Sequence, residues 1–492
     1  MKIMNKIYSL TGLLLLCSAM ILAQSPANRT SKTIVADVLA QMPAKEVSQY
    51  NNQLKDLAST GEDGVLQLVK MINPPGKGSN ANVEYALSGL SHYVSAQGQE
   101  SSRAVVANAY IKALDVVTDR EIKTFIIRQL QIAGKDESVT KLSSYLNDES
   151  LSGPASRALA AINSESSGVV LVDALKTVSN DKSKKDILIA IAEMQIPTAE
   201  GALKSLVGTG DDDMQKTVLY ALSRVGSKAS LPILASAAEK AGFAMEKTGA
   251  NEAYIALIKR VLLQKDVKEA EKAAGDLMKK AQKAGQNQTR ESALQILMDA
   301  NPDNTLKLLQ TALKDPSLNY RNYALASALD YADNKMVTEL LKSLKKANAE
   351  TKTDILNAFI RMCEMPQNRA YLAANGTDIF IEQLSDNNAQ VKQAAAEILA
   401  KIGGGKAVVA LVNQLKSTDE QTVKIAKDAL DYTKGDISAA IAPVVANASD
   451  AGKIACLQLL GNRKASAHLS IVLDLINSGT PAVKEEAYAV LK

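Results

Sequence analysis

The 492-residue sequence contains no tryptophan, two histidines and three cysteines, and only 4% of its residues are aromatic. His92 and His468 lie far apart in the sequence, so no local two-histidine metal or acid–base site can form. We therefore expect no enzyme activity, no cofactor and no metal. The shortage of aromatic residues also favours closely packed helices with small side chains over one large central core.

The three cysteines are Cys17, Cys363 and Cys456. Cys17 lies in a leader segment, and the other two are expected on helices about three repeats apart. At roughly 10 Å per helix layer, their Cα atoms cannot come within the ~7 Å that a disulfide requires. Both thiols are therefore predicted to be buried and apolar in character.

The sequence has no strong excess of either charge. It holds 57 Lys and Arg against 53 Asp and Glu. Without Lys2 and Lys6 of the leader, the balance is 55 against 53, a net charge of +2. Such a chain lacks the basic surface that nucleic-acid binding needs, so no nucleic-acid partner is expected.

Residues 1–23 have the features of a secretory signal peptide. Lysines near the start precede an apolar run from Leu10, and the small residue Ala23 marks the expected cleavage site. The alternative, a lipoprotein anchored through Cys17, is not favoured because Leu16 stands where a small residue is usual. No later segment is apolar enough to span a membrane. We expect an exported protein, periplasmic or extracellular.

The stretch from Ser385 to Thr418 contains the unit from which most of the chain is built. Glycines 403–405 interrupt its apolar period and permit a left-handed turn, which predicts two short amphipathic helices. The first carries Val391, Ala395, Ile398 and Ile402 on one face, and the second carries Val408, Leu411, Val412 and Leu415. Neither helix can bury its apolar face alone, so the unit must be repeated.

Equivalent first-helix positions recur through the chain. We identify them as Ile122, Met214, Thr289, Tyr320, Val391, Val423, Ile454 and Val483, the last four separated by 32, 31 and 29 residues. The 391, 423, 454 and 483 positions are predicted to be buried between neighbouring repeats. Helix starts are indicated at Asp119, Asp211, Asp386 and Pro481. About ten units are expected from Asp119 onward.

This organisation predicts four parts of the chain. Residues 1–23 form the signal peptide, 24–80 a helical cap with a Pro/Gly linker, 81–118 a first long helix pair, and 119–492 the repeats. The repeats end in a half repeat, because Pro481 to Lys492 resembles a first helix with no second helix after it. We therefore expect that Lys492 is not the natural end of the folded unit, or that a partner covers this face.

The repeat pattern resembles HEAT repeats, in particular the short HEAT-like type named after phycobilisome lyases. The likeness rests on an Asp, Val, Lys/Arg, Ala, Ala-Leu pattern, as in Asp419, Val423, Lys424, Ala426, Ala429 and Leu430, and again in Val483, Lys484 and Ala487. It implies an all-α, right-handed α-solenoid (superhelix) of stacked antiparallel helix pairs, with armadillo-like repeats of about 31 residues.

The function expected from this architecture is a non-catalytic scaffold for protein–protein interaction, with an unknown protein partner. We expect the second helices to form the inner curve of the solenoid. The alternative is the N-terminal repeat module of a larger secreted carbohydrate-active protein, with a domain of the 3-keto-disaccharide hydrolase type beyond Lys492.

One candidate binding feature recurs with the repeats. A basic residue follows the first-helix position at Lys123, Arg290, Arg321, Lys392, Lys424 and Lys484. These residues could pair with acidic residues of neighbouring repeats, or they could form a ridge for an acidic partner.

Three other motifs resemble known kinds of ligand site. Asp211–Asp213 lacks the Gly and Glu of a calcium loop, so it is interpreted as a helix start. The glycines before Lys406 lack the strand and the Ser or Thr of a phosphate loop, so they are interpreted as a turn. Tyr85 and His92 share a helix face that a small ligand could stack on, although an exposed polar face is the simpler interpretation.

Overall fold

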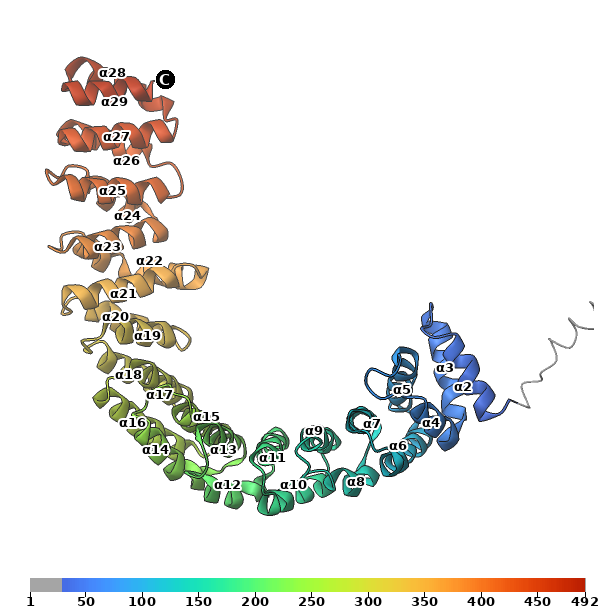
Figure 1. Ribbon diagram of the computed structural model, residues 1–492. Helices are drawn as coiled ribbons and strands as arrows, with labels where there is room; N and C mark the ends of the chain where they lie inside the picture. Colours follow the sequence, from blue (N-terminus) through green and yellow to red (C-terminus); the bar gives the residue numbers. More distant parts are fainter. Residues whose placement is uncertain (1–28, 492) are drawn as a thin grey trace, which may run out of the picture. The chain divides into compact units, whose positions relative to one another are not determined.

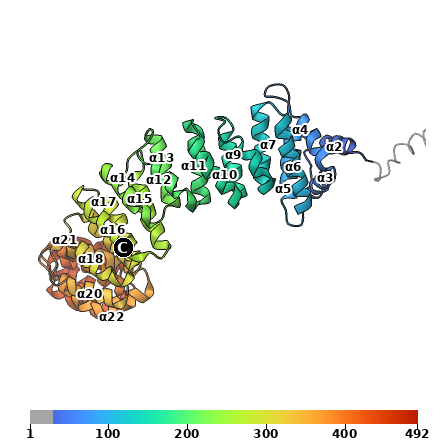
Figure 2. The ribbon, with the colours of Figure 1, turned by 90° about the horizontal axis from the view of Figure 1, so that it is seen from below.

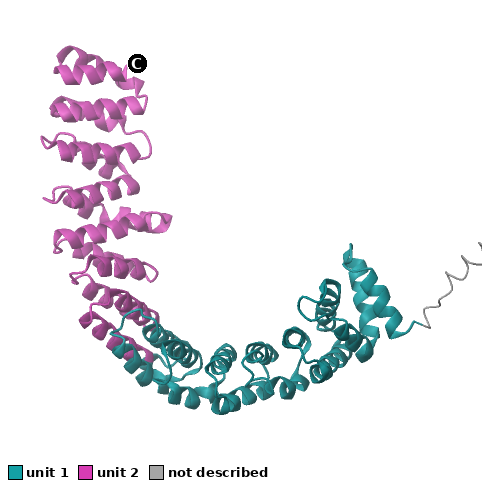
Figure 3. Cartoon of the chain, in the orientation of Figure 1, with its two compact units in different colours: residues 1–269 teal, residues 270–492 magenta. Residues whose placement is uncertain are grey.

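The structure is a computed structural model, and it describes residues 29–491. These residues form 28 α-helices, α2 to α29, with short 3-10 turns between some of them, and no strand occurs among them. The chain divides into two compact units, residues 1–269 and 270–492 (Figure 3). The predicted all-α solenoid of antiparallel helix pairs is confirmed within each unit. The signal peptide lies outside the described residues.

Unit 1 begins with three short helices and a Pro/Gly loop, and helix pairs follow (Figure 1). Its helices are α2 (Ser31–Ala40), α3 (Val47–Ser59), α4 (Gly61–Lys70), α5 (Ala81–Val94), α6 (Glu100–Val116), α7 (Arg120–Ala133), α8 (Val139–Ser143), α9 (Ser152–Ile162), α10 (Glu165–Thr177), α11 (Asp181–Met194), α12 (Glu200–Leu206), α13 (Asp212–Val225), α14 (Leu231–Lys240) and α15 (Ala250–Leu263).

Unit 2 continues the helix pairs, and α16 (Val267–Lys283) crosses the boundary between the units. Its other helices are α17 (Asn287–Ala300), α18 (Thr305–Ala312), α19 (Leu318–Leu329), α20 (Asn334–Ser343), α21 (Ala349–Met362), α22 (Pro366–Gln383), α23 (Ala389–Ile402), α24 (Gly405–Gln414), α25 (Glu420–Tyr432), α26 (Ser438–Ile441), α27 (Asp450–Asn462), α28 (Leu469–Ser478) and α29 (Pro481–Val490).

In unit 1 the first helices of successive pairs form one row and the second helices form another. Consecutive first helices, α7, α9, α11, α13 and α15, pack along much of their length, whereas α8, α10 and α12 contact one another far less. Seen from below, the helices of this unit lie side by side across the stack (Figure 2). The closely packed row lies on the inner side of the curve (Figure 1).

The expectation that second helices form the inner curve is therefore wrong for unit 1. The first helices can approach closely because small side chains face their neighbours, as at Ala155, Ala190 and Ala221, all of which are buried. Unit 2 follows the same rule, since α21, α23, α25, α27 and α29 pack closely in sequence while α20, α22, α24 and α26 are more widely spaced. The first helices thus form the continuous surface.

The stretch 385–418 folds as expected into α23 and α24. Gly403 and Gly404 adopt positive φ angles of 67° and 87°, which residues with a Cβ atom disfavour. Between the two helices they make the turn that the sequence predicts. The apolar positions of both helices are buried or packed against the core of unit 2.

The register of the repeats is set by the residue that caps each first helix. Side chains cap α19, α21, α23, α25 and α27 at Ser317, Asn348, Asn388, Asp419 and Ser449. Asp119 and Asp211 cap α7 and α13, as predicted. Asp386 is not a cap, because Asn388 caps α23 and Asp386 accepts the Asn388 N–H at 2.9 Å.

In most first helices the third residue after the cap is buried between repeats, although in α21 this residue, Thr351, is only half-buried. Val391 and Val483 occupy this position and are fully buried, as predicted. In α25 the equivalent residue is Thr422 rather than Val423, although both are buried. In α27 it is Gly452, so the predicted burial of Ile454 is wrong, and Ile454 is only half-buried.

Gly452 stands where the first turn of α27 meets the end of α24. A Cβ atom at Gly452 would lie 1.9 Å from the carbonyl oxygen of Leu415 and 3.0 Å from the Cβ of Ala448. A backbone atom cannot easily move away from such a contact. This position therefore requires glycine because a side chain would not fit, not because of its φ angle.

We predict that Gly452→Ala lowers the free energy of unfolding by about 1–3 kcal/mol, because the added methyl group overpacks the contact with Leu415. The matched control is Gly275→Ala in α16, where a Cβ atom meets nothing within 4 Å. There alanine should raise helix stability by about 0.5–1 kcal/mol. Urea denaturation followed by circular dichroism measures both. Equal stability of the two variants would contradict the close contact.

Candidate functional site: a polar groove on the first helices of unit 2

Ion pairs join five consecutive repeats of unit 2, those that begin with α17, α19, α21, α23 and α25, and each pair runs from one first helix to the next first helix or to the residues just before it. The basic partner is the fourth residue after the helix cap in α17, α19, α21 and α23, and the acidic partner belongs to the following repeat. We call this set the ion-pair ladder, and its pairs are Arg290–Asp315, Arg321–Asp354, Lys352–Asp386 and Lys392–Asp419.

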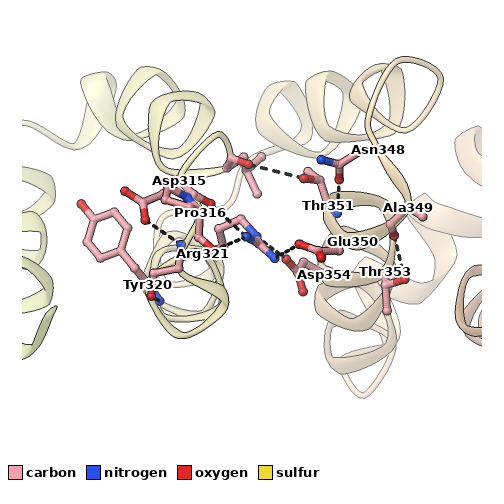
Figure 4. A network of polar contacts seen from close by, with 12 residues as sticks. Asp315, Pro316, Tyr320, Arg321, Asn348, Ala349, Glu350, Thr351, Thr353 and Asp354 are labelled. Carbon is pink, nitrogen blue, oxygen red and sulfur yellow. Dashed lines mark hydrogen bonds and ion pairs between the residues drawn. The ribbon is translucent and has the colours of Figure 1, made fainter.

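Arg321 is the best-enclosed member of the ladder, with 4% of its side chain exposed. Its Nε donates to Asp354 at 2.7 Å, and Nη1 donates to the carbonyl oxygens of Asp315 and Pro316 at 2.9 and 3.2 Å. Nη2 donates to Glu350 at 3.1 Å (Figure 4). Burial alone would lower the pKa of Arg321, but the ion pair with Asp354 outweighs it and the pKa is raised.

Arg290 of α17 makes a similar ion pair with the repeat that begins with α19. It forms an ion pair with Asp315, and its guanidinium carbon lies 3.8 Å from the centre of the Tyr320 ring. Burial would raise the pKa of Asp315. The hydrogen bonds from Arg290 and from the Ser317 N–H reverse this and hold the pKa below its ordinary value.

The six basic residues predicted from the sequence thus have different surroundings. Arg290, Arg321 and Lys392 pair with acidic residues of the next repeat, and the first two are buried. Lys123 lies 5.5 Å from the centre of the Tyr145 ring. Lys424 is the fifth residue after its cap, not the fourth, and is exposed, while Lys484 is half-buried.

The sequence analysis missed Lys352, which donates to Asp386 at 2.7 Å. Counting four residues from the capping Asn348 would have found it.

Unit 1 joins some of its repeats with carboxylates and serines instead. Glu200 at the start of α12 accepts hydrogen bonds from the Ser227 N–H and from the hydroxyls of Ser227 and Ser230, at 2.5 to 3.1 Å. Burial would raise the pKa of Glu200, yet these bonds and the nearby Lys204 lower it to about 2. Ser152 of α9 likewise donates to Asp186 of α11 at 2.6 Å.

A cavity of about 640 Å³ lies over α19, α21 and α23, directly above the Arg321–Asp354 pair. We call it the polar groove. Its wall residues are mostly the second, fifth and ninth residues after the helix caps, which point away from the neighbouring repeats. The lining residues are Pro316, Leu318, Arg321, Asn322, Glu350, Thr353, Asp354, Asn357, Gln390, Gln393, Ala394 and Glu397.

The polar groove is lined mainly by side chains that can form hydrogen bonds. The side-chain amides of Asn322, Asn357, Gln390 and Gln393 make no hydrogen bond to any of residues 29–491, so each can offer a donor and an acceptor to a ligand. Its lining residues, all within the described part of the chain, include no histidine, cysteine, serine or lysine. Thr353 supplies the one hydroxyl among the lining side chains, and it donates to the carbonyl oxygen of Ala349 at 2.9 Å.

The other motifs taken from the sequence have structural roles. Asp211 accepts the Met214 N–H at 2.8 Å as a helix cap. The ring of Tyr85 stacks against Tyr50, with centroids 5.1 Å apart, and His92 is exposed on the same helix. Cys363 and Cys456 are free and buried, and burial raises their pKa values to about 11 and about 12.

Among residues 29–491, no group of three or more His, Cys, Asp or Glu side chains could hold a metal ion. None of the helices in this range has the length and apolar character needed to cross a membrane.

No protein-family model and no curated protein matches this sequence. Solved structures that resemble it include Kap121p bound to RanGTP, at 11% identity and a TM-score of 0.48, covering 95% of this chain and 56% of that one. The karyopherin Kap121p bound to the SUMO protease Ulp1p resembles it at 12% identity and a TM-score of 0.48, covering 93% and 54%. This chain thus spans little more than half the length of Kap121p, and a likeness of this degree does not bear on function.

We predict that Arg321→Met lowers the free energy of unfolding by about 3–5 kcal/mol, because it leaves the buried Asp354 carboxylate without its partner. The double variant Arg321→Met/Asp354→Leu should recover part of this loss. Chemical denaturation measures both. As a control, Lys342→Met breaks the exposed pair with Glu339 and should change stability by less than about 1 kcal/mol. A double variant no more stable than the single one would argue against this account.

Proposed function

We propose that this chain is a non-catalytic scaffold that binds an extended segment of a protein partner in the polar groove over α19, α21 and α23. The observation that carries the proposal is the set of four unpartnered amides, Asn322, Asn357, Gln390 and Gln393, around the groove. Exposed polar side chains are ordinary, but these converge on one hollow from three successive repeats. Beneath them lies a floor fixed by the Arg321–Asp354 pair.

An extended polypeptide fits such a groove because its backbone offers one donor and one acceptor at each residue. Side-chain amides of asparagine and glutamine can satisfy both. Successive first helices lie roughly 10 Å apart, which is the length of about three residues of extended chain. A peptide that runs across the repeats can therefore meet an amide on each of the three helices, and many weak contacts add along the array.

The sequence-based alternative, a repeat module of a larger secreted carbohydrate-active protein, stays a prediction. None of the features of residues 29–491 described above favours it over a protein-binding role. Reading the coding sequence that follows the codon for Lys492 tests it directly.

The binding role is tested by panning a library of random twelve-residue peptides on the purified chain. We expect enriched peptides to lose binding to Asn357→Tyr/Gln393→Tyr, since both residues are exposed lining residues and the new rings fill the groove. The control is Asn413→Tyr, on the exposed face of α24 in the same unit, which should bind as the parent does. Peptides that bind all three proteins equally would exclude the polar groove as the site.

We further propose that the scaffold is exported, and that residues 1–23 direct this export. The support is the pattern of the leader itself, with its lysines, its apolar run and Ala23. An exported location also fits two buried thiols that need no reducing environment.

Expression of the full chain in a Gram-negative host tests the proposal on export. We expect the protein in the periplasmic fraction with Gln24 as its first residue, found by N-terminal sequencing. A Leu14→Arg variant, which interrupts the apolar run, should stay in the cytoplasm with its leader uncleaved. A lipid-modified N-terminus at Cys17, or a cytoplasmic parent protein, would contradict it.

A further inference from the structure

The polar groove carries an uncompensated negative charge. One basic residue, Arg321, faces three acidic residues, Glu350, Asp354 and Glu397, which gives the lining a net charge of −2. The nearby lysines of the ion-pair ladder do not neutralise this negative charge. Lys352 is bound to Asp386 at 2.7 Å, and Lys392 lies 3.6 Å from Asp419 and donates to Thr422.

Two of the three carboxylates remain available to a ligand. Asp354 is buried and is the main partner of Arg321. Glu350 pairs only with the outer nitrogen of Arg321, Nη2, and 76% of the Glu350 side chain is exposed. Glu397 is exposed in the middle of α23 and makes no hydrogen bond or ion pair with any residue between 29 and 491. Lys401, one turn further on, donates to Glu364 instead, at 2.7 Å.

The negative charge of Glu350 has a structural explanation that does not apply to Glu397. An acidic residue in the first turn of a helix, as Glu350 is in α21, is stabilised by the helix dipole. Glu397 is the ninth residue after the cap of α23, too far from the helix start for that effect. Its charge acts on Lys401 one turn further along the helix, but that lysine donates to Glu364, so the carboxylate of Glu397 at the rim of the groove is left without a direct ion pair among residues 29–491.

We infer that the polar groove selects cationic peptides, with lysine or arginine side chains of the bound segment lying against Glu350 and Glu397. This inference rests on the proposed peptide-binding function and adds the chemical class of the partner. Charge complementarity carries it, because a cation in the groove would lie against Glu397, which has no ion-pair partner among residues 29–491, and against Glu350, whose partner there is the outer nitrogen of Arg321. An anionic or phosphorylated segment would instead meet a net negative surface.

The test compares three fluorescent peptides, each built from four repeats of Gly-Ser-Lys, Gly-Ser-Gln or Gly-Ser-Glu. A side chain at every third position recurs about every 10 Å in an extended chain, which matches the spacing of the repeats in any register. Fluorescence anisotropy with the purified full chain should give a Kd about tenfold lower for the lysine peptide than for the glutamine peptide. The difference should shrink as NaCl rises from about 50 to 500 mM.

Charge-neutralising variants locate the effect. Glu350→Gln/Glu397→Gln should bind the lysine and glutamine peptides with similar Kd values, while Glu397→Gln alone should remove part of the preference. The control is Glu382→Gln on α22, which removes the same charge from an exposed pair with Lys345 outside the groove. It should leave the preference for lysine unchanged.

The outcomes separate the two proposals. If all three peptides bind equally well and Asn357→Tyr/Gln393→Tyr abolishes binding, the groove binds peptides but the inferred charge selection is wrong. Tighter binding of the glutamate peptide would also overturn it. If no peptide binding depends on the groove, the proposed function fails as well. A lysine preference that survives Glu350→Gln/Glu397→Gln would assign the selection to another surface and overturn the inference.

Discussion

The structure depends on close packing between the first helices of successive repeats. Each helix pair has an apolar face that it cannot bury by itself, and the neighbouring first helix supplies the missing cover. In most repeats the residue three positions after the cap lies in this contact, as Val391 and Val483 do. Because that contact fixes how each helix is rotated, it also decides which of its residues remain exposed. The exposed surface is thus a consequence of the packing register.

Much of the fold could be predicted from the sequence, because the apolar period and the glycine turn of α23 and α24 are local signals. The register could not be read from apolar residues alone. In α27 the contact position is filled by Gly452, which has no side chain to mark it, so the apolar pattern points to the half-buried Ile454 instead. Nor could the sequence predict which row of helices lies on the inner side of the curve in unit 1. Both rows carry apolar faces, and they differ mainly in how closely they pack.

The ion-pair ladder was predicted only in outline. A basic residue near the start of each first helix is visible in the sequence, but its partner lies 25 to 34 residues away in the pairs of Arg290, Arg321 and Lys352. Which basic residue is enclosed depends on the helix rotation, and that follows from the cap. The groove itself gave no sequence signal, because amides scattered over three helices resemble any solvated face until the stacking brings them together.

The first helices therefore supply both the packing that stabilises the stack and the exposed residues that are available for recognition. The third and fourth residues after the cap are committed to packing and to the ladder, while the second, fifth and ninth are not. In α25 these three are Gln421, Lys424 and Asp428, and in α27 they are Ala451, Ile454 and Gln458. On α25 an amide and a carboxylate recur at Gln421 and Asp428, with Lys424 between them, whereas on α27 Gln458 donates to Glu486. What distinguishes α19, α21 and α23 is that their amides and carboxylates line one cavity in which Arg321 is the single basic residue, an arrangement that the repeat does not require.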